Sequence, residues 1–146
     1  MLIRKIKEAD LEDLQKVYLE LCEDESNLEQ MKEKFRAIDC NEDYYLLGAE
    51  VEGKIVGTVM GIVCHDLVGN FKTFMTVENV VVMGNYRGRG ICKALFQELE
   101  RIASERECTY IYLVSGETRN VAHQMYRKVG FRSDNVVGFR KYLNKA

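Results

Sequence analysis

Apolar residues recur every three or four positions in four parts of the chain, which is the spacing of one face of a helix. In the first part, Leu11, Leu14 and Val17 follow this rhythm with polar residues between them. Helices are therefore predicted over residues 10–21, 28–38, 91–102 and 120–129.

Residues with known capping preferences stand at the ends of these predicted helices. Asp10 comes directly before the first apolar stripe, in the position of an N-cap. Ser26 and Glu29 have the spacing of a capping box at the start of the second helix. Gly130 follows the fourth helix, where a left-handed C-terminal cap favours glycine.

Shorter apolar runs between the helices predict strands. Two of these runs meet across Glu52 and Gly53, a dipeptide that indicates a tight hairpin. The antiparallel strands come before a strand–helix–strand unit, so the pattern predicts an α/β (α+β) fold with helices on both faces of a mixed sheet. The predicted strands cover residues 2–6, 44–51, 54–64, 71–82, 109–115 and about 138–143.

Length and composition narrow the class of protein. A chain of 146 residues can bury a core of its own, and with no proline and no low-complexity segment it is expected to form a single domain, residues 1–146. The net charge of −2 argues against a general nucleic-acid or membrane-surface binder. The five scattered cysteines and the lack of an apolar leader at the N-terminus indicate a cytoplasmic protein with reduced thiols and no bound metal.

The stretch from Asn79 to Leu95 contains three glycines and two arginines between an apolar strand and an apolar helix. A helix N-terminus has unpaired N–H groups, and Gly88 and Gly90 would let phosphate oxygens approach them. Arg87 and Arg89 would add charged donors. The glycine spacing fits neither a dinucleotide fingerprint nor a Walker lysine motif. The alternative is a plain glycine turn with solvated arginines.

The segment Arg87-Gly88-Arg89-Gly90-Ile91-Cys92 resembles the acetyl-CoA pyrophosphate loop of the GNAT-type N-acetyltransferases. The later segment "NVAHQMYRKVGF" is similar to a second signature of that family. The resemblance implies a mostly antiparallel sheet of six to seven strands with about four helices. It also implies transfer of an acetyl group from acetyl-CoA to a primary amine. Two departures from the family pattern are Cys92 in place of the last Gly or Ala and Met83-Gly84 in place of a proline.

The resemblance also implies which residues bind the cofactor. The loop from Arg87 to Cys92 and the next residue, Lys93, would hold the pyrophosphate. Val80, Val81 and Val82 would hold the pantetheine arm and the acetyl oxygen through backbone groups, at a bulge of the strand. Asn120 would contact the cofactor arm, although it is equally suited to cap a helix.

Two side chains are candidates for acid–base catalysis. Glu78 lies just before the three valines and would take the proton of the amine, directly or through water. Regular alternation would place it on the face of Val80 and Val82 and opposite Val81. Tyr126 matches the tyrosine of the family that protonates the leaving thiolate. The alternatives are a solvent-exposed or arginine-paired glutamate and a tyrosine that only packs in the core.

Several possibilities stay open from the sequence alone. Glu50 and Glu117 are the reserve candidates for the base. The chain could instead be a catalytically inactive acyl-CoA-binding sensor or interaction domain. The acceptor could be an amine on a small molecule or a peptide, and the protein could be a monomer or a homodimer.

Overall fold

The computed structural model describes residues 1–144. These residues divide into two compact units, one from Met1 to Leu113 and one that begins at Val114. The elements of the first unit are β1 (Leu2–Lys5), the 3₁₀ turn η1 (Glu8–Asp10), α1 (Leu11–Tyr18), α2 (Leu28–Asp39), β2 (Tyr44–Val51), β3 (Lys54–Cys64), β4 (Phe74–Val82), the 3₁₀ turn η2 (Gly84–Tyr86), α3 (Ile91–Glu105) and β5 (Ile111–Leu113). The second unit contains α4 (Asn120–Lys128).

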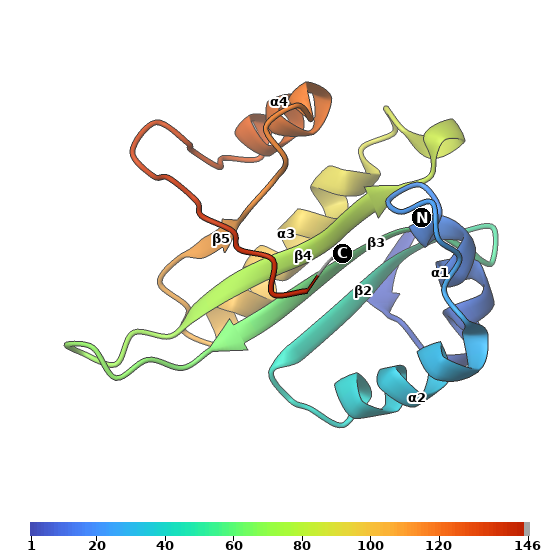
Figure 1. Cartoon of the computed structure of the whole chain (residues 1–146), viewed down its shortest axis with the longest axis horizontal. Coiled ribbons are helices and arrows are strands. Elements are labelled where there is room, and N and C mark those ends of the chain that lie inside the picture. The colour runs from blue at the N-terminus through green and yellow to red at the C-terminus, as the bar shows by residue number, and fades with distance from the viewer. Residues whose placement is uncertain (145–146) are drawn as a thin grey trace. The chain divides into compact units, whose positions relative to one another are not determined.

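The first unit is built on a five-stranded sheet in the order β1-β2-β3-β4-β5 (Figure 1). The first four strands pair antiparallel, and β5 runs parallel to β4 because α3 crosses over between them. The mixed sheet predicted from the sequence is therefore confirmed. At the β2–β3 hairpin, Glu52 and Gly53 both have positive φ, as a two-residue turn of this kind requires.

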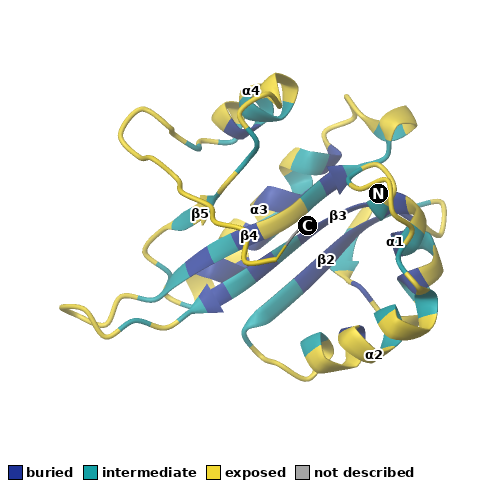
Figure 2. Ribbon diagram, in the orientation of Figure 1, coloured by how far each residue is buried: buried dark blue, intermediate teal, exposed yellow. Residues whose placement is uncertain are grey.

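Helices cover both faces of this sheet. Residues of α1 and α2, among them Leu14, Val17 and Phe35, pack with Leu46 and Val81 on one face. On the other face lies α3, which runs behind β3 and β4 in Figure 1. Figure 2 shows the buried positions concentrated along the central strands.

Gly61 lets α3 approach the sheet closely. A Cβ at this position would lie 2.8 Å from Leu99 Cδ2 and 2.9 Å from Met75 Sδ. Both distances are shorter than a normal van der Waals contact, so the absence of a side chain in β3 makes room for the fully buried Leu99 of α3.

The prediction of six to seven strands is wrong, since the described residues contain five. The strand expected near residues 138–143 does not form, and α4 is followed by residues without a strand. Phe139 and Leu143, two apolar residues of this segment, are exposed. A strand needs a hydrogen-bonded neighbour, and the pattern of a single segment does not guarantee one.

Both helices of the N-terminal half begin where predicted, with Asp10 in the N-cap position of α1, but both predicted side-chain caps need correction. Asp10 does not cap α1 with its side chain; its carboxylate accepts hydrogen bonds from the Lys7 N–H and from Arg4. The Arg4 guanidinium holds the pKa of Asp10 below its usual range. At α2 the cap is Asn27, one residue after the predicted Ser26, and its Oδ1 accepts from the Gln30 N–H.

Of two further predicted boundaries, one differs from the structure and one agrees with it. The strand expected from residue 71 begins at Phe74, because Phe71 has a φ of +57°, which is outside the extended region. At the end of α4, Gly130 has a φ of +99°, which agrees with the predicted need for glycine after this helix. Within residues 1–144, no helix is long and apolar enough to cross a bilayer.

Candidate active site

A bulge interrupts β4 at Asn79. Glu78 pairs with Met60 and Val81 pairs with Thr58, so β4 advances three residues while β3 advances two. Asn79 has a φ of +55°, a left-handed conformation that asparagine tolerates better than most residues. The extra residue takes the backbone of β4 out of regular pairing next to Val80.

The bulge changes which side chains share a face, so the predicted alternation is wrong. Residues opposite each other in a sheet point to the same side, which places Glu78 and Val81 on one face. Val81 is buried in the core under α1 and α2. Val82 lies on the α3 face, where a Cβ built on Gly57 would meet Val82 Cγ2 at 3.2 Å.

Glu78 is exposed on this strand. None of the ion pairs within residues 1–144 involves it, so the arginine-paired alternative does not describe the structure. The reserve candidate Glu50 differs, because its Oε2 accepts a hydrogen bond from Arg4 Nε at 2.6 Å. Glu78 is therefore the carboxylate beside the bulge that is open to a ligand.

The glycine loop and the start of α3 form a backbone surface for an anion. Gly88 and Gly90 have φ values of +76° and +77°, and a Cβ on either residue would meet no atom within 4 Å. Ala94 donates its N–H to the Gly90 carbonyl and so begins the hydrogen bonding of the helix. The preceding N–H groups, from Ile91 to Lys93, are those that a helix start leaves without an intrahelical partner.

The two arginines of the loop make contacts that the sequence did not predict. Arg87 donates from Nε to the Val82 carbonyl at 3.1 Å, and its Nη2 lies 3.4 Å from Glu20 Oε2. Arg89 lies over the ring of Tyr86, 5.1 Å from its centroid. Arg87 thus links the loop to the end of β4 and to Glu20. The Arg89 guanidinium makes a cation–π contact with the ring of Tyr86.

Glu20, just after α1, is a residue that the sequence analysis missed. Its Oε1 accepts from the Gly84 N–H at 3.1 Å, and its Oε2 faces Arg87. It connects the end of α1 to the loop that precedes α3. No spacing or motif in the sequence points to this contact, since 64 residues separate Glu20 from Gly84.

Cys92 and Lys93 differ in exposure at the start of α3. Lys93 is exposed, whereas Cys92 is half-buried. Burial raises the pKa of the Cys92 thiol to about 11. The thiol is therefore neutral at physiological pH and adds no charge to the anion-binding loop.

The second unit carries Tyr126 and Asn120 on α4. Tyr126 is buried, and its ring packs edge-on against Phe131 with centroids 6.2 Å apart. Asn120 is the first residue of α4, and the N-cap is Arg119, so Asn120 does not cap the helix as the alternative interpretation proposed.

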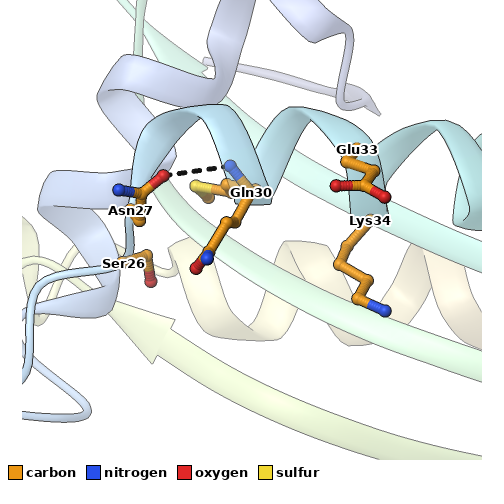
Figure 3. Close-up of a pocket in the computed structure, with 6 residues that line it drawn as sticks. Ser26, Asn27, Gln30, Glu33 and Lys34 are labelled. Carbon is orange, nitrogen blue, oxygen red and sulfur yellow. Dashed lines mark hydrogen bonds between the residues drawn. The ribbon is translucent and has the colours of Figure 1, made fainter.

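Two surface hollows of the first unit lie away from these residues. The larger, about 540 Å³, lies on α2, where Figure 3 shows the side chains around it. It is lined by Ser26, Asn27, Gln30, Met31, Glu33 and Lys34. The second lies between β1 and α2. Neither hollow contains a predicted catalytic or cofactor-binding residue. Among residues 1–144, no three His, Cys, Asp or Glu side chains gather as a metal site.

Comparison with known proteins identifies the class of enzyme that has this arrangement of a bulged strand, a glycine loop and a helix that begins at the loop. Residues 6–131 match the Acetyltransferase (GNAT) family, and the chain belongs to this family. It is an acetyltransferase of the GNAT type.

Individual relatives agree with this assignment. The chain is 32% identical over 108 residues to Acetyltransferase ECA0875 of Pectobacterium atrosepticum, which covers 74% of this chain and 71% of the relative. The fold is shared with a provisionally named acetyltransferase from Agrobacterium tumefaciens, at a TM-score of 0.91 and 24% identity over 97% of this chain and 99% of the other. It is also shared with glucosamine-6-phosphate N-acetyltransferase from Arabidopsis thaliana, at a TM-score of 0.85 and 23% identity over 98% of each chain.

Proposed function

We propose that the protein transfers an acetyl group from acetyl-CoA to a primary amine of a small molecule or peptide by direct attack. In this proposal Glu78 takes the proton of the amine and Tyr126 protonates the departing thiolate. The observation that carries the proposal is the bulge at Asn79, directly between Glu78 and the three valines. It leaves backbone donors beside an exposed carboxylate, which are the two groups that this reaction needs at its centre.

The loop before α3 fits the pyrophosphate of acetyl-CoA. A side chain at Gly88 or Gly90 would occupy open space beside the helix start, and glycine keeps that space free for phosphate oxygens. The N–H groups of Ile91, Cys92 and Lys93 would donate to them, and the exposed Lys93 would add a charge. The backbone of Val80, Val81 and Val82 would hold the pantetheine arm, and Asn120 would contact the arm from α4.

In the proposed reaction, Glu78 and Tyr126 each transfer one proton. An alkylammonium has a pKa of about 10, so its nitrogen has no lone pair at neutral pH until Glu78 has taken a proton. The nitrogen forms a bond to the acetyl carbon, and the carbon–sulfur bond breaks. The nitrogen then loses its second proton to solvent water, Tyr126 supplies a proton to the sulfur, and the phenolate regains a proton from solvent. Donors at the bulge stabilise the charge that develops on the acetyl oxygen.

An inactive acyl-CoA-binding domain would need no carboxylate at this position. Glu78 is exposed beside the bulge and free of the ion pairs that occupy Glu50. Its place directly before the bulge distinguishes Glu78 from the other exposed carboxylates. This arrangement favours the active enzyme over the sensor or interaction domain.

The test is an amine panel with release of the CoA thiol as the readout, run on the wild type and on Glu78→Gln. We expect the variant to bind acetyl-CoA normally and to lose about 10²–10⁴-fold in rate at neutral pH, because only the base is removed. Its rate should recover steeply as pH approaches the pKa of the amine, where free amine forms without help. The rate of the wild type should level off earlier.

A matched control is Glu100→Gln, which removes an exposed carboxylate from α3 without touching β4. It should follow the wild-type profile. A Glu78→Gln profile parallel to the wild type at every pH would show that Glu78 is not the base. Glu117→Gln and Glu50→Gln would then be compared in the same way. Failure of every amine to release thiol would contradict the proposed reaction.

A further inference from the structure

Three aromatic rings form a cluster at the β4–β5 edge of the sheet. Phe74 stacks on Tyr110 with centroids 5.1 Å apart and planes 6° apart. Tyr112 lies 6.0 Å from Phe74 and 6.3 Å from Tyr110. Tyr110 and Tyr112 are 53% and 44% exposed, so the cluster presents ring surface to solvent instead of filling the core.

The ladder pairing places this cluster on the face of Glu78. Phe74, Thr76 and Glu78 pair with alternate residues of β3, with no bulge between them, and so point to the same side. Tyr112 pairs with Thr76 across the parallel β4–β5 ladder and points there too. The candidate base and the rings therefore belong to one continuous surface.

Strand geometry gives the length of this surface. Residues two apart on a strand are separated by roughly 6.6 Å, and neighbouring strands by about 4.8 Å. Tyr112 is thus displaced from Glu78 by roughly 8 Å, and Phe74 by roughly 13 Å along β4. A primary amine held at Glu78 would reach the ring of Tyr112 with a group attached two or three bonds from its nitrogen.

The single negative charge on this surface indicates which kind of acceptor would bind there. Of Phe74, Thr76, Glu78 and Tyr112, only Glu78 is charged. One carboxylate complements one ammonium group, and the rings complement an apolar planar group that can stack or meet them edge-on. An acceptor with several ammonium groups would find no second partner among these four residues.

We propose that the acceptor of this enzyme is an arylalkyl monoamine, with its amine at Glu78 and its aromatic ring against Tyr112 and Phe74. This inference rests on the proposed function, because it uses Glu78 as the residue that meets the amine. It goes further by assigning to the aromatic cluster the choice of acceptor.

The experiment compares 2-phenylethylamine with hexylamine and spermidine, which keep a primary amine without the ring. We expect the highest kcat/KM for 2-phenylethylamine. Tyr112→Leu should raise the KM for this amine about 3- to 10-fold with little change in kcat, because the ring contact is made before and during reaction alike. The KM for hexylamine should stay within a factor of two, and Tyr112→Phe should keep the preference because it keeps the ring.

Phe71→Leu is the matched control. Phe71 is 66% exposed in the β3–β4 loop and is outside the three-ring cluster. It should not alter the preference for 2-phenylethylamine. A preference for hexylamine or spermidine in the wild type would overturn the inference. An equal loss for 2-phenylethylamine and hexylamine in Tyr112→Leu would also overturn it.

A binding measurement separates this inference from the proposed reaction. Calorimetric titration of 2-phenylethylamine, with and without CoA, tests the surface even if no amine is acetylated. Binding that Tyr112→Leu weakens and Tyr112→Phe preserves would support the aromatic surface although the proposed reaction had failed. Absence of binding to the wild type under both conditions would contradict it.

Discussion

At the scale of single residues, Tyr126 has to serve both packing and the proposed proton transfer. Its ring is buried and contacts Phe131 edge-on. A phenylalanine would fill the same space, so the aromatic contact does not depend on the hydroxyl group. The two tasks of Tyr126 can therefore be separated by removing one oxygen atom.

We expect Tyr126→Phe to bind acetyl-CoA with unchanged affinity and to turn over more slowly. The variant keeps the ring contact with Phe131 and loses the proton donor, so kcat and kcat/KM should fall together. Steady-state kinetics with an accepted amine, together with a thermal melt, provide the measurement. A normal melting temperature with an unchanged rate would show that the oxygen takes no part in the slow step.

Cys92 permits a prediction about pH. Burial raises the pKa of its thiol to about 11, so at pH 7 only about one molecule in 10⁴ holds the reactive thiolate. Iodoacetamide should therefore label the exposed Cys22 and Cys40 well before Cys92. Because the pKa is raised, labelling of Cys92 should increase as pH rises toward 11. Mass spectrometry of peptides after timed labelling measures this, and equal labelling of the three cysteines at pH 7 would contradict it.

At the scale of elements, the loop before α3 is shaped before any ligand binds. Glu20 accepts a hydrogen bond from the Gly84 N–H and forms an ion pair with Arg87. The Nε of Arg87 donates to the Val82 carbonyl. Gly88 and Gly90 supply left-handed turns within this frame. These contacts hold the first part of the loop, from Val82 to Arg87, and α3 begins directly after its second left-handed glycine, where the N–H groups of the helix start are available to an anion.

A pair of glycine variants tests whether this loop binds the cofactor. Gly90 and Gly53 both have a φ of +77°, and a Cβ on either would meet no atom within 4 Å. Alanine should therefore strain the backbone by a similar amount, about 1–3 kcal/mol, at both positions. We expect Gly90→Ala and Gly53→Ala to melt at similarly lowered temperatures, while only Gly90→Ala binds acetyl-CoA more weakly. Equal affinities measured by calorimetry would show that Gly90 only forms a turn.

At the scale of the whole molecule, the sequence predicts elements that depend on local pattern and misses those that depend on partners. The β2–β3 hairpin follows from Glu52-Gly53, and α3 follows from its apolar stripe. The bulge at Asn79 has no local signal that fixes its position, so strict alternation put Glu78 on the wrong side relative to Val81. The prediction of a final strand was wrong for a related reason, since a strand needs a pairing partner and the local pattern does not specify one.

The same contrast between local pattern and long-range contact applies to the residues of the candidate site. The glycine loop and Glu78 stand out in the sequence through composition and family resemblance. Glu20 and the cluster of Phe74, Tyr110 and Tyr112 do not, because their contacts join residues far apart in the chain. Such contacts become visible only when the fold brings the strands and loops together.

Acetyl-CoA and free CoA should both stabilise the folded protein against heat. A ligand that binds only the native state raises the free energy of unfolding by mass action, about 2.7 kcal/mol at a hundredfold excess over Kd. For a chain of 146 residues this corresponds to a rise of about 5–10 °C in Tm. Pantetheine lacks the pyrophosphate and should stabilise much less. A thermal melt that neither CoA compound shifts would contradict the cofactor assignment.

The bulge in β4 has a consequence for how this protein could evolve. Loss of one residue at Asn79 or Val80 would let β4 pair with β3 without interruption and would satisfy more backbone hydrogen bonds. The same loss would remove the irregular backbone beside Glu78 on which the proposed chemistry depends. Selection for a sturdier sheet and selection for turnover thus act in opposite directions on this residue. A lineage that had abandoned catalysis would be free to lose the bulge, so a regular β4 would mark a relative that has changed its task.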